Sequence, residues 1–206
     1  MVALSGGIYG GVKPPRYLSG KVYIPQHVLA SSGTLAVTAT RRYYVPFFCS
    51  FTQTFAGMKT YNSGVGDNGK KIRMGVYNEA TTGGPGTLVA EVSETTLTGA
   101  SAIRTATGSM TLIGGQMYFL CFTSDTAPTM YVMGHFASAA GSVAPAPFST
   151  QHGIFTWDVG STDSRTQPLG DYVDTAYGAL PSTAVAPTAS VSVQAVSPLP
   201  LFGLYV

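Results

Sequence analysis

The sequence predicts an all-β protein, an antiparallel jelly-roll β-sandwich with an extended N-terminal arm. Three observations favour this class: short β-rich runs recur between clusters of turn residues, no helical 3.6-residue periodicity is visible, and only 10% of the residues are charged while 25 are glycines. With 206 residues, 45% of them hydrophobic, the chain is long and apolar enough for one sizeable core. The same composition excludes a disordered protein.

The first expected element is the arm, residues 1–20, which combines glycines with a Pro-Pro pair and has no periodicity. Its apolar residues have no core of their own, so we expect them to order on a partner protein. The alternative is an arm that folds back on its own domain. The candidate docking residues are Ile8, Tyr9, Val12, Pro14 and Pro15.

Residues 21–206 are expected to form a single domain of eight strand-like runs and a closing strand. In one run, Ile72, Met74 and Val76 share a face, which is typical of a strand buried on one side. The run MYFLCF at 117–122 is apolar on both faces and therefore predicts a central strand. The eight runs are 34–39, 41–51, 55–62, 70–78, 86–92, 102–112, 116–124 and 129–136, and the closing strand is 196–206.

The segment GVGDNGKK at 64–71 matches a Gly-x-Gly-x-x-Gly phosphate-binding pattern. Such a loop works by leading into a helix whose N-terminal amides hold the phosphates. Here a strand-like run follows, and Lys71 occupies the position that a phosphate loop gives to Ser or Thr. Asp67-Asn68-Gly69 instead predicts a hairpin turn, because Asn and Gly tolerate the positive φ of tight turns.

Two long loops are expected in the last third of the chain, around GIFTWDV (153–159) and GDYVDTAYG (170–178). Exposed aromatic rings stack on sugars, while neighbouring carboxylates accept hydrogen bonds from the sugar hydroxyls. The candidate glycan-binding residues are therefore Trp157, Asp158, Tyr172 and Tyr177. A buried core position is the alternative for Trp157. The loop acids do not have the spacing of an EF-hand, which favours solvated acids over a calcium site.

The sequence indicates no enzyme, no cofactor and no metal site. His27, His135 and His152 are far apart in the chain and have no metal-ligand spacing, and no Gly-x-Ser-x-Gly elbow is present. Cys49 and Cys121 each lie inside an apolar run, so we expect free, buried thiols.

The charge distribution and the hydropathy of the chain argue against nucleic acid and membranes as partners. All but Arg165 of the eleven basic residues precede position 105, which predicts a basic sheet face beside acidic loops or, alternatively, charge complementarity between subunits. The basic residues are scattered rather than dense, so we expect no nucleic acid. The first residues do not resemble a secretory signal and no apolar run is long enough for a bilayer, so we expect cytoplasmic synthesis and no membrane insertion.

Five segments in a fixed order resemble the jelly-roll, carbohydrate-binding-module-like domain of tail fibres, spikes and head fibres of tailed bacteriophages. The resemblance covers about residues 17 to 206, and we expect a small attachment device in place of the long shaft of such fibres. The segments are YYVPFF (43–48), KIRMGVYNEATTGGPGTLVAEV (71–92), GGQMYFLCFTSD (114–125), AYGALPSTA (176–184) and SPLPLFGLYV (197–206).

The resemblance implies a non-enzymatic protein of the virion surface, a fibre, spike or receptor-binding subunit, that docks on the particle through its arm and touches host-surface glycans. The implied partners are other virion proteins (portal, capsid, tail or baseplate), further copies of itself in a homotrimer, and a host glycan. The alternatives are a purely structural capsid or tail decoration protein and a stand-alone carbohydrate-binding module.

Overall fold

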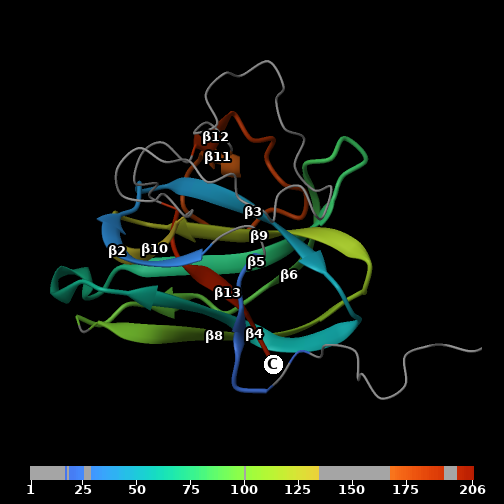
Figure 1. The fold of residues 1–206 in the computed structure, drawn as a ribbon. Helices are drawn as coiled ribbons and strands as arrows, with labels where there is room; N and C mark the ends of the chain where they lie inside the picture. The colour runs from blue at the N-terminus through green and yellow to red at the C-terminus, as the bar shows by residue number, and fades with distance from the viewer. Residues whose placement is uncertain (1–16, 18, 26–28, 100, 135–167, 193–198) are drawn as a thin grey trace, which may run out of the picture.

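The computed structural model describes residues 17, 19–25, 29–99, 101–134, 168–192 and 199–206. Within these residues, two antiparallel sheets pack face to face as a β-sandwich (Figure 1). One helical element is described, a single 3-10 turn at Val65–Asp67. The all-β class predicted from the sequence is therefore confirmed.

Sheet A is organised around β4 (Gln53–Asn62). On one side, β4 pairs along its whole length with β8 (Ala102–Leu112). On its other side, β13 (Phe202–Tyr205) and β10 (Thr129–Gly134) follow one another. The sheet is completed by β1 (Val22–Tyr23) beside β13 and β2 (Leu29–Ala36) beside β10.

Sheet B is organised around β9 (Gln116–Ser124), which lies between β3 (Arg41–Cys49) and β5 (Lys71–Glu79). The β5 strand pairs further with β6 (Pro85–Glu91) and β7 (Thr95–Thr96). Beyond β3 lie β11 (Pro168–Asp174) and β12 (Ala189–Ser192).

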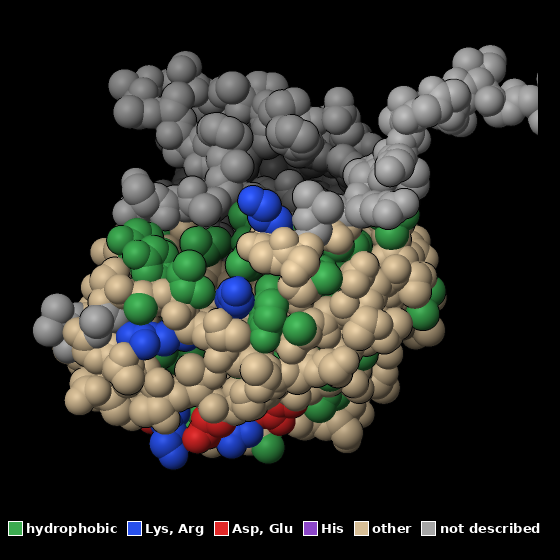
Figure 2. All heavy atoms as spheres, turned by 90° about the horizontal axis from the view of Figure 1, so that it is seen from below, with side chains coloured by type: hydrophobic (Ala, Val, Ile, Leu, Met, Phe, Trp, Pro, Cys, Tyr) green, Lys and Arg blue, Asp and Glu red, His purple; other side chains and the backbone are tan. Residues whose placement is uncertain are grey.

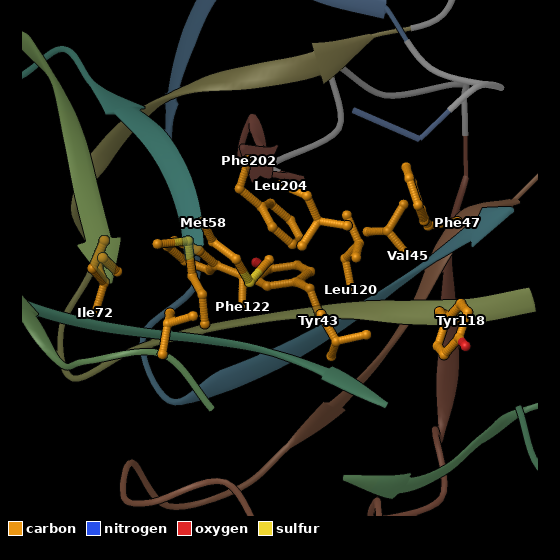
Figure 3. Close-up of a cluster of buried hydrophobic side chains, with 14 of the residues drawn as sticks. Tyr43, Val45, Phe47, Met58, Ile72, Tyr118, Leu120, Phe122, Phe202 and Leu204 are labelled. Carbon is orange, nitrogen blue, oxygen red and sulfur yellow. The ribbon is translucent and has the colours of Figure 1, made fainter. Parts of the chain in front are cut away.

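The main core lies between the two sheets and is built from their alternating inward positions (Figure 3). Tyr43, Val45 and Phe47 of β3 point toward Phe202 and Leu204 of β13, and all five are at most 1% exposed. On β5 the inward residues are Ile72, Met74 and Val76, all fully buried, as the alternation predicts. Each fully buried side chain of this size contributes roughly 1.5–3 kcal/mol of transfer free energy.

A second, smaller cluster covers the outer face of sheet B. It contains Tyr44 of β3, Tyr77 of β5 and Cys121 of β9, joined by Leu180 from the segment after β11. The rings of Tyr44 and Tyr77 meet edge to face at 5.6 Å. Sheet B is thus buried on both faces, which confirms the prediction of a central strand at 117–122.

The two cysteines lie on opposite sides of sheet B. Cys49 belongs to the main core and Cys121 to the second cluster, and both are free and fully buried. Burial raises the pKa of both thiols. The expectation of free thiols is confirmed.

Two local predictions were wrong. The stretch expected to form a loop at 170–178 begins as β11, because its backbone pairs with β3 on one side and with β12 on the other. The Asp67-Asn68-Gly69 segment is a turn, with Gly69 at φ +83°, but Asn68 has φ −58°. It is not a hairpin, because it leads from β4 in sheet A to β5 in sheet B.

The described residues of the expected arm contact the sandwich. The Tyr17 ring packs edge to face on Tyr23 and on Phe55, with centroids 4.6 and 5.1 Å away. Its hydroxyl accepts a hydrogen bond of 3.1 Å from the Ser50 amide, and the Gly20 amide donates to the Val206 carbonyl. The docking candidates of the arm lie outside the described residues.

Candidate binding face on sheet A

The outer face of sheet A presents three tyrosines on three strands, Tyr61 of β4, Tyr131 of β10 and Tyr205 of β13. Each is half-buried and stands beside inward residues that are fully or almost fully buried, so strand alternation turns its ring away from the core. Lys59 lies on the same face two residues before Tyr61. We call this surface, with Ile103 of β8 beside it, the tyrosine face.

The strand register places these side chains in rows. Gly57 lies opposite Tyr205 on one side and Thr107 on the other, and two residues along β4, Lys59 lies opposite Gly203 and Thr105. A further two residues along, Tyr61 lies opposite Ile103, which is 62% exposed. Because a strand rises about 3.3 Å per residue, successive rows are about 7 Å apart.

Two glycines allow side chains to lie down on this face. A Cβ at Gly57 would be 3.0 Å from Cε1 of Tyr205 and would collide with the Ala106 carbonyl. A Cβ at Gly203 would be 3.1 Å from Cγ1 of Val22. Tyr205 and Val22 therefore lie across the sheet rather than standing up from it, which makes this part of the face flat.

The rings are held by contacts with one another and with Lys59. Tyr61 and Tyr131 stack with centroids 4.2 Å apart and planes within 9° of parallel. The Lys59 ammonium lies 4.6 Å from the centroid of the Tyr205 ring, within the range of a cation–π interaction. The rings are thus preorganised on rigid strands rather than on loops.

The face carries positive charge and no carboxylate. The strands of sheet A contain Lys59 and Arg104 and not one Asp or Glu. Arg104 alternates with Ile103 and Thr105 and so turns to the opposite face of the sheet, where its guanidinium donates to Oδ1 of the buried Asn62 at 2.6 Å and to the Thr98 carbonyl at 2.7 Å. Lys59 is therefore the basic residue that these strands place on the tyrosine face. Figure 2 views the molecule from below, where hydrophobic and basic side chains are scattered among uncharged surface in the middle and acidic side chains lie beside basic ones at the lower rim.

Of the two described glycan candidates, Tyr172 lies in β11 of sheet B and Tyr177 in the segment that follows it, and the two are on opposite faces of the sheet. Tyr172 packs against the main core, with its ring 6.4 Å from that of Tyr43, and the Arg41 guanidinium covers it at 3.8 Å. Tyr177 lies on the outer face, where its hydroxyl donates to Glu94 at 3.0 Å. Burial raises the pKa of that hydroxyl. The structure does not bring these two rings together, and Trp157 and Asp158 lie outside the described residues.

The surroundings of Tyr177 form a polar clamp. Arg73 of β5 pairs with Glu91 at 2.6 Å and with Glu94 at 2.8 Å, and the second oxygen of Glu91 accepts the Leu180 amide at 3.1 Å. These contacts fasten the segment after β11 onto sheet B. Glu91, Glu94 and Tyr177 are therefore engaged within the domain.

The described part of the chain contains neither a metal-ligand cluster nor a membrane-spanning helix. No three of its His, Cys, Asp or Glu side chains are grouped closely enough to hold a metal ion. None of its helices has the length and hydrophobicity needed to cross a membrane.

Comparisons with known protein families, with curated proteins and with solved structures find no match to this chain. The candidate face is therefore defined by the residues of the chain itself.

Sequence reasoning missed the tyrosine face, although a signal for it was present. In GMKTYN (57–62), Lys59 and Tyr61 alternate with buried residues, and the same alternation isolates Tyr131 and Tyr205. The alternation gives two faces for each strand but does not say which face a second layer covers. Attention to aromatic residues in loops favoured Trp157 and Tyr177 instead.

Proposed function

We propose that this chain is a non-enzymatic surface protein of a tailed-bacteriophage particle whose β-sandwich contacts glycans on the host. The tyrosine face is the observation that carries the proposal. The Tyr205 ring lies across a rigid sheet, and the stacked rings of Tyr61 and Tyr131 present their edges and hydroxyls beside it; such a surface offers the ring contact and hydrogen-bonding groups that sugars require. The phage context comes from the sequence resemblance, and the single domain spans residues 21–206.

The jelly-roll assignment is part of this proposal. Its support is the order in which the chain alternates between sheets: β2, β4, β8 and β10 belong to sheet A, whereas β3, β5, β9 and β11 belong to sheet B. Repeated crossing from one sheet to the other is what a jelly roll requires, since its two Greek keys are each divided between the sheets.

Attachment to the particle is assigned to the arm, and the resemblance favours a trimer. The position of Tyr17 supports a short tether, because its ring and hydroxyl fix the chain at one end of the sandwich immediately after residues 1–16. Deleting residues 1–16 retains Tyr17, so we expect an unchanged melting temperature together with loss of incorporation into particles. Normal incorporation of the truncated protein would contradict this part of the proposal.

A second candidate function, a purely structural decoration protein, is favoured by an apolar tip next to Tyr17. Phe51 and Ile113 lie on two adjoining turns and are 38% and 48% exposed. The turns are joined by a hydrogen bond from the Gly114 amide to the Thr52 hydroxyl. Two exposed hydrophobic side chains beside the anchor of the arm fit a contact with a virion neighbour.

A binding experiment decides between the two functions. The purified protein is tested on a glycan array and for adsorption to host cells, together with the double variant Tyr131→Ala, Tyr205→Ala. Thr54→Ala is the control, because Thr54 lies on the same sheet face, bonded to Thr111, at the far end of β4. We expect adsorption by the wild type and the control and at least a tenfold loss in the double variant. If the double variant still adsorbs as the wild type does, the tyrosine face is not the glycan-binding site. If the wild type does not adsorb at all, the decoration function is favoured.

A further inference from the structure

We infer that the tyrosine face selects acidic polysaccharides, with Lys59 binding a sugar carboxylate while the sugar ring stacks on Tyr205. The inference rests on the proposed function and adds the chemical class of the glycan. In this inference the sugar hydroxyls form hydrogen bonds with Thr105 and Thr107, which are exposed on the neighbouring strand.

The position of Lys59 is the first argument. It lies at the centre of the face, between Thr105 and Gly203 in its own row and between Gly57 and Tyr61 along β4. Among the described residues, every ion pair involves other basic groups, namely Arg41, Lys70, Lys71 and Arg73. Within this described part of the chain the Lys59 ammonium contacts the Tyr205 ring and pairs with no carboxylate, so it can attract an anion from solution.

Charge complementarity is the second argument. Because the strands of sheet A contain no acidic residue, an anion that approaches this face meets no like charge on its strands. A neutral sugar leaves Lys59 without a counter-ion, whereas a uronic or other acidic sugar supplies one. The face is therefore expected to bind acidic sugars in preference to neutral ones.

Geometry is the third argument. The ammonium lies 4.6 Å from the centroid of the Tyr205 ring, so both groups are within reach of a single sugar unit that carries its carboxylate on the ring. Strands are about 4.8 Å apart, so the hydroxyls of Thr105 and Thr107 are one strand away from Lys59 and Gly57. One acidic sugar can therefore draw the ammonium from the ring toward its carboxylate, and then stack on Tyr205 and reach a threonine hydroxyl.

Two other occupants fit less well. A second copy of the chain would need an acidic surface, and four of the seven acidic residues in the described part of the chain, Asp67, Glu91, Glu94 and Asp174, are already paired with basic groups of their own chain. A nucleic acid would need a row of cations to follow its phosphates, and of the two basic residues on the strands of this sheet only Lys59 turns to the tyrosine face, since Arg104 turns to the opposite one.

The test compares polygalacturonan with the same polymer after its carboxyl groups have been reduced to alcohols. Dissociation constants are measured by biolayer interferometry for the wild type, Lys59→Gln, Lys59→Arg and Lys71→Gln. The last variant removes the same charge from sheet B, where Lys71 is half exposed. Melting temperatures of all four proteins check that the fold is retained.

We expect the wild type and Lys71→Gln to bind the acidic polymer at least tenfold more tightly than the reduced one. Lys59→Gln should lose this preference, and Lys59→Arg should keep it. Equal binding of both polymers by the wild type, or an unchanged preference in Lys59→Gln, overturns the inference and leaves the proposed function standing. Equally tight binding of single-stranded DNA also overturns it. No binding to either polymer or to any array glycan overturns the inference and the proposed function together.

Discussion

Asp67 fastens the connection between the two sheets, and its replacement by alanine should cost a large part of the stability of the fold. Its side chain is 1% exposed, and one oxygen accepts a hydrogen bond of 2.9 Å from the Lys70 ammonium. Both of its oxygens lie 3.0 Å from the Thr129 amide at the start of β10. The carboxylate thus joins the turn after β4 to a strand that lies 62 residues further along the chain.

The magnitude follows from these contacts. Hydrogen bonds to a charged group contribute about 1.5–3 kcal/mol each, and breaking a buried ion pair by removing one partner costs about 3–5 kcal/mol. Lys70 is 25% exposed and keeps its 2.8 Å bond to the Ala127 carbonyl, which reduces the cost of leaving it unpaired. We therefore expect Asp67→Ala to lose about 3 kcal/mol, which at about 2–4 °C per kcal/mol for a chain of this size lowers Tm by about 6–12 °C.

Urea denaturation and differential scanning calorimetry measure this loss. Asp67→Asn is the matched control, since it keeps an acceptor for the Thr129 amide without the charge, and it should fall between the wild type and Asp67→Ala. The double variant Asp67→Ala, Lys70→Ala separates the ion pair from the bond to the backbone. A loss below about 1 kcal/mol in Asp67→Ala would refute the reasoning, because hydrogen bonds to a buried carboxylate are expected to contribute more than that to the free energy of unfolding.

Three further predictions concern single side chains. Gly57→Ala should lower the melting temperature and move the Tyr205 ring, because the added Cβ meets the Ala106 carbonyl and Cε1 of Tyr205. Calorimetry measures the first effect and near-UV circular dichroism the second, and an unchanged spectrum would contradict the contact between Gly57 and Tyr205. The hydrogen bond from Arg41 lowers the pKa of Asp174, so the stabilisation is present above the ordinary value of 3.8 and is lost as the pH falls through the lower folded value. Asp174→Asn should therefore be less stable than the wild type at pH 7, and the difference should shrink as the pH falls below 3.8; denaturation at several pH values measures it, and a loss that does not depend on pH would contradict the ion pair. Cys121 should not react with a thiol reagent at pH 8 until the protein unfolds, because it is fully buried and its burial raises the pKa of its thiol; fast labelling of the native protein would contradict the second cluster.

Much of the fold could be predicted because the strands alternate clearly. Ile72, Met74 and Val76 turn to the core as their spacing predicts, and 117–122 is buried on both faces because a second cluster covers sheet B. The strand β11 could not be predicted, since PLGDYVD contains Pro, Gly and two Asp residues, and it is pairing with β3 and β12 that fixes its backbone.

The candidate face was harder to predict, for a reason that lies in the topology. Tyr61, Tyr131 and Tyr205 are far apart in the sequence and meet only because β10 and β13 follow one another along the same side of β4. Nothing in the local pattern around Tyr205 says that a glycine on another strand lies beneath its ring. Strand order is a property of long-range pairing, so residues that share a face across strands are seen only when the sheet is known.

The unequal covering of the two sheets has a consequence for how this protein can diversify. The outer positions of β3, β5 and β9 are filled by a second cluster, so substitutions there remove packed volume and cost folding free energy. The outer positions of β8, such as Ile103 and Thr105, are exposed, and substitutions at such positions usually change stability by no more than about 0.5 kcal/mol. Selection can therefore exchange the exposed side chains of β8 beside the tyrosines one at a time, and alter what the surface recognises, at little cost in folding free energy.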